Sequence, residues 1–253
     1  NDEISRLTGS FNKMLSRLDD AFTAQKQFSA SAAHELRTPL AVMQTNLEVF
    51  ARKKTPTIEE YQDIFGMIQN QTERLSHLSE VLLDMTGIQS VERSDFISLA
   101  ELTDEVCCDL ASIADQKKVE LIQEEGDCTV TGSYLLLYRA VYNLVENAIK
   151  YNHSGGKVTV KISQKKDLPA AHSKPTDYAL VEVTDTGIGI SPEFQEKIFD
   201  PFFRVDKSRS RAMGGAGLGL ALVNEIARQH GGQVKVLASS EQGSTIALIL
   251  PLS

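Results

Sequence analysis

A histidine and a glutamate stand side by side in the segment FSASAAHELRTPL, close to a proline. The apolar spacing around them predicts a long helix, and Pro39 lacks the N–H that such a helix needs. Because proline also crowds the carbonyl four residues earlier, at Glu35, we expect the backbone to bend beside His34. A histidine becomes a nucleophile when a neighbour holds one ring nitrogen, and Glu35 is a candidate for that neighbour. The segment alone is also explained by a surface histidine near a helix kink.

Two asparagines share one face of a later predicted helix, in the segment NLVENAIKY. Asn143 and Asn147 are four residues apart, and Lys150 follows almost one turn further along. Two amide oxygens and an ammonium that converge in this way suit a hydrated Mg²⁺ ion and a triphosphate. Taken by itself, this helix is explained better by polar residues on a solvated face.

Two glycine-rich segments could let the backbone approach a ligand closely. DTGIGI follows a predicted strand, and its first residue, Asp185, can accept a hydrogen bond from an exocyclic amine. GGAGLGL, at residues 214–220, opens a predicted helix, whose first N–H groups favour phosphate oxygens. Basic residues shortly before it provide a local positive site in an acidic chain: Arg204, Lys207, Arg209 and Arg211. Each segment by itself is also typical of an ordinary turn or loop.

The composition limits the class of protein. The chain has 253 residues, enough for about two domains, and 42% of them are hydrophobic, which excludes wholesale disorder. A formal net charge of −8 and the lack of a long basic run argue against nucleic acid as a major partner. The three cysteines have no metal-ligand spacing, and no run of about 18 apolar residues indicates a membrane span. The chain begins without Met and in mid-pattern, so we expect a fragment of a longer protein.

The elements that must position these residues fall into two groups. Up to about residue 90, apolar residues recur at steps near three and four, which predicts two long amphipathic helices. The segment KKTP separates them, with Thr55 as the expected N-cap and Pro56 as the first residue of the second helix. Since one helical hairpin leaves wide apolar stripes uncovered, we expect a homodimer in which two hairpins form a four-helix bundle.

The rest of the chain alternates helical and strand patterns. Helices are expected at residues 99–114, 133–151 and 217–230, and strands at 119–123, 157–163, 178–184, 233–238 and 245–250. The polar stretch at residues 164–177, which holds two prolines, is predicted to be a hairpin loop. Helices layered on one face of a mixed sheet give an α/β sandwich of the α+β class. The chain is therefore predicted to be multidomain, first α and then α+β.

Considered together, in this order and at this spacing, the motifs resemble those of bacterial sensor histidine kinases. HELRTPL resembles the box around the phosphorylated histidine, NLVENAIKYN the asparagine box, and DTGIGI, FDPFFR and GGAGLGLAL the boxes that surround the nucleotide. The opening NDEISRLTGSFNKMLSRL is similar to the last helix of a HAMP signalling segment. The resemblance implies the end of a HAMP-like helix at residues 1–20, a dimerisation and phosphotransfer hairpin at 21–90, and a catalytic ATP-binding domain of the histidine kinase and gyrase type at 91–253.

The resemblance also implies roles for individual residues. His34 matches the phosphorylated histidine, and Glu35 matches the acidic residue that orients and activates it. Thr38 matches the residue that helps to place water when the kinase dephosphorylates its response regulator. Asn147 matches the Mg²⁺ ligand, and Asn143 matches its partner near the phosphates.

For the nucleotide, Lys150 and Tyr151 match residues that contact it and its phosphates, and Asp185 matches the carboxylate that reads the adenine. Further residues are matched to the nucleotide-binding turns and the phosphate loop: Gly187, Gly189, Arg204, Gly215, Gly217, Leu218 and Gly219. The resemblance therefore implies ATP as substrate and Mg²⁺ as cofactor.

The activity implied is that of a protein-histidine kinase. The γ-phosphoryl group of MgATP would move to Nε2 of His34 while Glu35 accepts the Nδ1 proton, and then to an aspartate on the receiver domain of a response regulator. Residues 87–94, between the helical and the mixed part, are the candidate hinge that lets the two parts meet. The resemblance further implies a homodimer, transmembrane helices in segments absent from this chain, and a place on the cytoplasmic side of the inner membrane.

Two other functions stay open at this stage. Gyrase-type ATPases share the expected nucleotide-binding fold, but they place a general-base glutamate where this chain has Asn143, and an amide cannot take a proton from water. A dimeric scaffold that senses ATP and regulates a partner by contact would need the nucleotide site, but it would not need the full H-E-x-x-T-P sequence that begins at His34.

Overall fold

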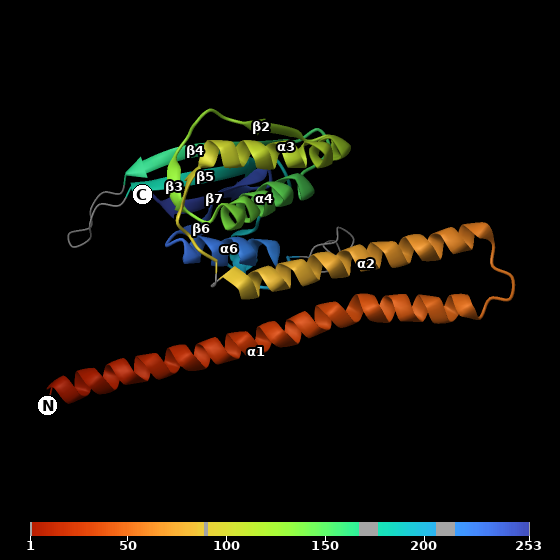
Figure 1. Cartoon of the computed structure of the whole chain (residues 1–253), viewed down its shortest axis with the longest axis horizontal. Helices are drawn as coiled ribbons and strands as arrows, with labels where there is room; N and C mark the ends of the chain where they lie inside the picture. Colours follow the sequence, from red (N-terminus) through yellow and green to blue (C-terminus); the bar gives the residue numbers. More distant parts are fainter. Residues whose placement is uncertain (1, 89–90, 167–176, 206–215, 253) are drawn as a thin grey trace. The chain divides into compact units, whose positions relative to one another are not determined.

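The hairpin predicted for the first part of the chain is present. In the computed structural model, which describes residues 2–88, 91–166, 177–205 and 216–252, helix α1 runs Asp2–Ala51 and helix α2 runs Ile58–Gly87 (Figure 1). The N-cap of α2 is Thr57 and not Thr55: the Thr57 hydroxyl accepts from the Glu60 N–H at 3.3 Å, and the Glu60 carboxylate accepts from the Thr57 N–H at 3.1 Å. This reciprocal capping box starts the helix two residues beyond the predicted position.

The first helix, α1, continues through Pro39, and Figure 1 shows that it changes direction along its length. Pro39 is buried, whereas much of the apolar surface of the hairpin is exposed. Phe22 and Phe65 each expose 67% of their surface, and Ile58 exposes 77%. A stripe of this kind is what a second hairpin would cover in a four-helix bundle.

The remainder of the chain is built on a five-stranded mixed sheet with the strand order β2-β4-β5-β7-β6. Its strands are β2 (Glu120–Gln123), β4 (Lys157–Lys166), β5 (Asp177–Asp185), β6 (Gln233–Ser240) and β7 (Gly243–Pro251). β2 and β4 run parallel, and the other neighbours pair antiparallel. Two short strands that the sequence analysis did not predict form a separate antiparallel pair: β1 (Asp95–Ser98) and β3 (Thr129–Gly132).

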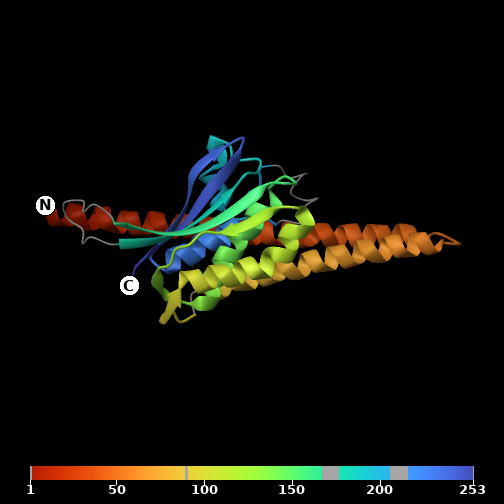
Figure 2. The ribbon, with the colours of Figure 1, turned by 90° about the horizontal axis from the view of Figure 1, so that it is seen from above.

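Three helices lie along one side of the five-stranded sheet (Figure 2): α3 (Leu99–Lys117), α4 (Tyr134–Lys150) and α6 (Gly219–Gln229). Two single turns of 3₁₀ helix follow β5, at Pro192–Phe194 and Lys197–Phe199. The core lies between the helices and the sheet, where Leu137, Ile226 and Leu248 are fully buried. This is the predicted α/β sandwich. Of the predicted hairpin loop, residues 167–176 lie outside the described residues, and β4 reaches Lys166.

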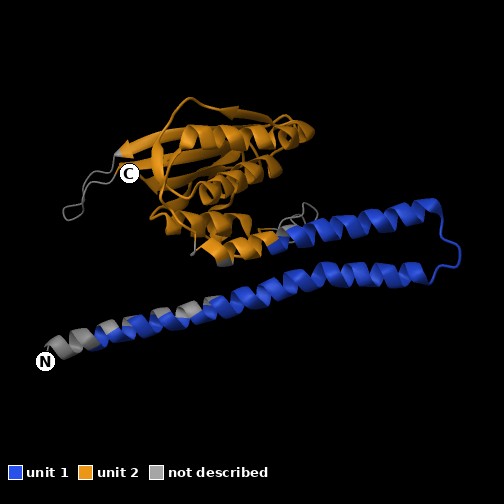
Figure 3. Cartoon of the chain, in the orientation of Figure 1, with its two compact units in different colours: residues 1–79 blue, residues 80–253 orange. Residues whose placement is uncertain are grey.

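The chain divides into two compact units, Asn1–Ser79 and Glu80–Ser253 (Figure 3). The division falls inside α2, so the last two turns of this helix belong to the second unit. There, Asp84 forms an ion pair with Arg139 of α4, and Ile88 is fully buried. These contacts attach the end of α2 to the sandwich. The second unit therefore starts at Glu80, before residue 91, where the catalytic domain was expected to begin.

Candidate functional site

His34 is exposed on α1, in the first unit. The Thr38 hydroxyl donates a hydrogen bond of 3.0 Å to the carbonyl oxygen of His34. One residue further on, Pro39 has no N–H to donate to the carbonyl of Glu35. A threonine hydroxyl that bonds four residues back and a proline both disturb the regular helical pattern. Both features therefore act on the turn of α1 that carries His34.

The Glu35 carboxylate lies toward α2, where it forms an ion pair with Arg74 across 3.5 Å. Both side chains are largely buried, with 19% of Glu35 and 16% of Arg74 exposed. The pair links the residue beside His34 to the second helix of the same hairpin. Arg74 was not predicted from the sequence, because it belongs to none of the motifs. The only signal for its inward position is its place next to Leu75, which belongs to the apolar seam.

Asn143 and Asn147 lie against the first residue of α6, Gly219. A Cβ atom at Gly219 would be 2.6 Å from Asn143 Oδ1 and 3.6 Å from Asn147 Nδ2, so a side chain there would press on Asn143. Asn143 is held by a hydrogen bond of 2.8 Å from its Nδ2 to the carbonyl oxygen of Arg139. The two asparagines that share a helix face in the sequence are thus brought to the N-terminus of α6.

The start of α6 has no side-chain cap, because Leu218 occupies the N-cap position. The first N–H groups of a helix have no partner within the helix and attract anions. Just before it, Gly217 has φ = 72°, and its carbonyl oxygen accepts from the Phe202 N–H at 2.8 Å. A Cβ atom at Gly217 would lie 2.7 Å from the Phe203 carbonyl oxygen. The segment FDPFFR, which ends at the half-buried Arg204, therefore packs directly against this turn.

The turn at Asp185 lies against the C-terminal end of α4. The Ile188 N–H donates to the Tyr151 carbonyl oxygen at 3.4 Å, and a Cβ atom at Gly187 would overlap the same oxygen. The Gly187 N–H donates to Asp185 Oδ1 at 2.7 Å, which orients the carboxylate. Burial raises the pKa of Asp185, and hydrogen bonds from the backbone N–H groups of Gly187 and Ser244 partly offset that rise.

Lys150 and Tyr151 lie at the same end of α4. Lys150 is the last residue of the helix, and its Nζ is 6.0 Å from the centre of the Tyr151 ring. The predicted nucleotide residues are therefore arranged along α4, with the α6 N-terminus beside its asparagines and the Asp185 turn at its end. One predicted site residue cannot be placed: Gly215 lies outside the described residues, together with the basic residues Lys207, Arg209 and Arg211.

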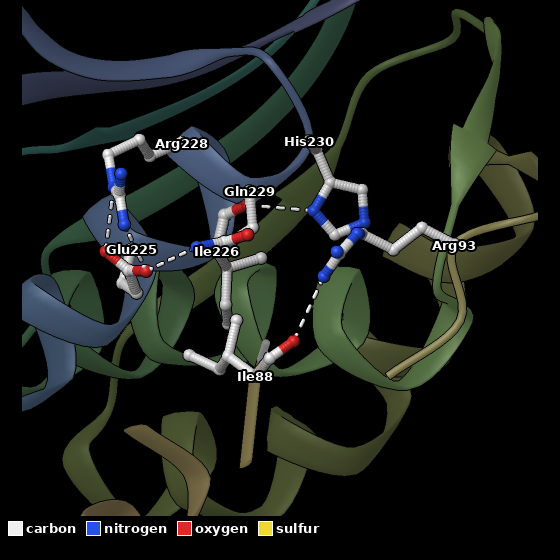
Figure 4. Close-up of polar contacts among 7 residues, drawn as sticks. All are labelled: Ile88, Arg93, Glu225, Ile226, Arg228, Gln229 and His230. Atoms are coloured by element: carbon white, nitrogen blue, oxygen red, sulfur yellow. Dashed lines mark hydrogen bonds and ion pairs between the residues drawn. The ribbon is translucent and has the colours of Figure 1, made fainter. Parts of the chain in front are cut away.

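In the predicted hinge, residues 87–94, a hydrogen bond joins the described residues near its two ends. The Arg93 guanidinium donates to the Ile88 carbonyl oxygen at 3.0 Å, and His230 lies beside it (Figure 4). His230 Nδ1 is 2.8 Å from the Ile226 carbonyl oxygen, and Nε2 accepts from the Ser133 N–H at 3.1 Å. Because Nε2 accepts, the ring is neutral and carries its proton on Nδ1. Burial lowers the pKa of His230, and the charge of Arg93 lowers it further.

Two features are absent from the described part of the chain. No helix in it is both long enough and apolar enough to cross a membrane. Nor does it contain a group of three or more histidine, cysteine or acidic side chains that could hold a metal ion. A Mg²⁺ ion would instead need amide and phosphate oxygens, which it accepts as ligands. Asn143 and Asn147, next to the start of α6, fit that requirement.

Two family models match the chain. Residues 24–90 match the His Kinase A (phospho-acceptor) domain, and residues 132–253 match the Histidine kinase-, DNA gyrase B-, and HSP90-like ATPase. The sensor histidine kinase CusS of Escherichia coli O6:H1 is 32% identical over 255 residues, which cover 98% of this chain and 50% of CusS. The signal transduction histidine-protein kinase ArlS of Staphylococcus aureus is 32% identical over 257 residues, which cover 98% of this chain and 53% of ArlS. The chain thus spans about half the length of the curated relatives it matches.

A solved structure shows the same fold. The histidine kinase ThkA, in complex with response regulator protein TrrA, has a TM-score of 0.68 and 22% identity, over 93% of this chain and 64% of the other. The phospho-acceptor domain around His34 is followed in this chain by the ATPase domain that carries Asn147 and Asp185. With both domains present in this order, and with relatives similar over almost its whole length, the chain belongs to the sensor histidine kinases.

Proposed function

We propose that this chain transfers the γ-phosphoryl group of ATP to His34 and from there to an aspartate of a response regulator. The observation that carries the proposal is the meeting of Asn143 and Asn147 with Gly219 at the N-terminus of α6, on the helix that ends beside the Asp185 turn. This arrangement offers amide oxygens and helix N–H groups to phosphates, and a carboxylate to the amino group of adenine. It occurs in a chain whose first unit carries an exposed histidine in the matching motif.

In the proposed complex, α4 and α6 hold the phosphates between them. The N–H groups at the start of α6, which Leu218 leaves without a side-chain cap, would receive phosphate oxygens. Asn147, with Asn143 beside it, would hold Mg²⁺, which neutralises phosphate charge when it is bound. Lys150 would contact a phosphate, and Asp185 would accept a hydrogen bond from adenine.

At His34, the Nε2 lone pair would attack the γ-phosphorus in line with the bond to the leaving oxygen. The N–P bond forms while that P–O bond breaks, ADP leaves, and the Nδ1 proton passes to Glu35. Since His34 and the nucleotide residues belong to different compact units, the reaction requires the units to meet, within one chain or between two copies. The two units divide between residues 79 and 80, inside α2, whereas the hinge expected at residues 87–94 lies within the second unit.

The proposed assembly is a homodimer, supported by the phospho-acceptor domain and by the exposed apolar stripe of the hairpin, which includes Phe22 and Phe65. The proposed acceptor is the receiver domain of a response regulator, in line with the complex that the ThkA structure contains. Thr38, one turn beyond His34, is the proposed residue that places water when the phosphorylated regulator is hydrolysed. CusS and ArlS are about twice as long as this chain, and CusS is named a sensor. We therefore place this chain, with its HAMP-like residues 1–20, on the cytoplasmic side of an inner-membrane sensor.

Incubation with γ-labelled ATP and Mg²⁺ tests the proposal. We expect an acid-labile, alkali-stable label on the wild type and none on His34→Gln, while His153→Gln, which replaces an exposed histidine of the second unit, keeps the label. A chain that binds ADP and acquires no label would contradict the proposal in favour of an ATP-sensing scaffold. Free phosphate released without any protein label would contradict it in favour of an ATPase.

A further inference from the structure

The Asp185 turn has a second neighbour besides α4, the end of the β6–β7 hairpin. Gly189 has φ = 69°, and a Cβ atom there would overlap the Ser240 carbonyl oxygen. A Cβ atom at Gly243, on the hairpin, would overlap the carbonyl oxygen of Asp185. The two turns therefore pack backbone against backbone, with no space for a side chain between them.

Two serines at this end of the hairpin connect it to the turn by hydrogen bonds. Ser239 of β6 and Ser244 of β7 are cross-strand partners, and their hydroxyl oxygens are 2.9 Å apart. Ser239 Oγ accepts from the Ile190 N–H at 2.7 Å. Ser244, which is 5% exposed, donates its backbone N–H to the Asp185 carboxylate. The serine pair is thus bonded to the first and to the last residue of the turn.

We infer that Ser239 is a positioning residue for adenine recognition, which acts through the turn and not on the nucleotide itself. Asp185 can discriminate between bases only if its carboxylate is held to within a fraction of an ångström. On one side, Tyr151 fixes the middle of the turn through the Ile188 N–H. On the other, Ser239 fixes its end at Ile190. Ser239 is also paired with Ser244, which together with Gly187 bonds the Asp185 carboxylate. This inference rests on the proposed nucleotide site.

A positioning role and a merely structural role predict different results. If Ser239 only stabilises the sandwich, its loss lowers the midpoint of thermal unfolding and leaves the choice between nucleotides unchanged. If Ser239 positions Asp185, its loss weakens the binding of ADP, because the carboxylate accepts a hydrogen bond from the adenine amino group. The affinity for GDP then stays unchanged. The ratio of the two dissociation constants is therefore the decisive measurement.

The experiment measures ADP and GDP dissociation constants for the whole chain by titration calorimetry, well below the unfolding midpoint. For Ser239→Ala we expect the ADP dissociation constant to rise about tenfold, because the half-buried Ile190 N–H loses its acceptor, with the GDP dissociation constant unchanged. Ser239→Thr keeps a hydroxyl and should restore the wild-type ratio. Ser163→Ala is the matched control, because it removes a hydroxyl that donates to Glu182 at 3.1 Å and does not touch the turn.

Amide hydrogen exchange of Ile190 in the nucleotide-free chain provides a second readout. Exchange should be faster in Ser239→Ala than in the wild type, and unchanged in Ser163→Ala. An unchanged ADP-to-GDP ratio in Ser239→Ala, or equal losses for both nucleotides, would overturn the inference. A wild type that binds no ADP would refute the proposed function itself, and the exchange of Ile190 would then still decide whether Ser239 holds the turn.

Discussion

Replacing Gly219 by alanine tests the contact on which the nucleotide site depends. The new Cβ atom would lie 2.6 Å from Asn143 Oδ1, whereas such contacts are ordinary only from about 3.4 Å and essentially absent below 3.0 Å. The amide oxygen and the start of α6 must therefore separate by about 0.4–0.8 Å. Asn143 has little freedom to yield, because its Nδ2 donates to the Arg139 carbonyl oxygen at 2.8 Å.

The separation removes Asn143 from a position where it can serve a bound phosphate or its metal ion. A hydrogen bond to a charged group contributes about 1.5–3 kcal/mol, which corresponds to a factor of about 10–100 in the dissociation constant. The fold itself should keep close to wild-type stability, since alanine is favoured over glycine in a helix by up to about 1 kcal/mol and this offsets the displacement. We therefore expect ADP binding to weaken about 10- to 100-fold while the unfolding midpoint changes little.

Titration calorimetry with ADP and Mg²⁺ measures the loss, and thermal unfolding followed by circular dichroism measures the stability. Gly66→Ala, inside α2 with nothing within 4 Å of the new Cβ atom, is the matched control and should bind ADP normally. A double-mutant cycle identifies the cause: in an Asn143→Ala background, Gly219→Ala should have no further effect. Wild-type ADP affinity in Gly219→Ala, or full additivity in the cycle, would refute the reasoning.

Two further predictions concern pH and the bend in α1. The unfolding free energy should fall as the pH decreases below about 6.5, because the unfolded His230 then takes up a proton while the folded ring, with its lowered pKa, stays neutral. Urea denaturation of the wild type and of His230→Gln should show their stability difference shrinking toward acid pH, and a constant difference would contradict the assignment. Pro39→Ala restores an N–H to α1 and should change the ratio of autophosphorylation at His34 to dephosphorylation of the regulator, so an unchanged ratio would count against a role for the bend.

The part of the site that lies on helices could be predicted from local spacing. Residues four apart share a helix face whatever the helix packs against, so the pairing of Asn143 with Asn147 follows once α4 is assigned. Asp185 was also placed correctly at the end of a strand, because period-two alternation ends there in the sequence. In both cases the information lies within a few neighbouring residues.

The parts that were missed depend on contacts between distant segments. Ser239 meets Ile190 across 49 residues of sequence, through a strand register that no local pattern encodes. Arg74 reaches Glu35 from the other helix of the hairpin. The start of α2 was misplaced for a different reason, since Thr55 and Thr57 both precede an apolar run and only the reciprocal bonds with Glu60 select the second.

The ion pair between Glu35 and Arg74 bears directly on the proposed chemistry. Consecutive side chains on an α-helix differ by about 100° around the axis. Because Glu35 is directed toward α2, the side chain of His34 is turned away from α2, and it is exposed. The carboxylate that should take the Nδ1 proton is thus engaged by a guanidinium on the neighbouring helix, and the two roles compete for it. Pro39, one turn further on and buried, lies where a change in the bend of α1 would move this turn relative to α2. A change in that bend would therefore act on the separation of Glu35 from Arg74, and through it on whether Glu35 can serve His34.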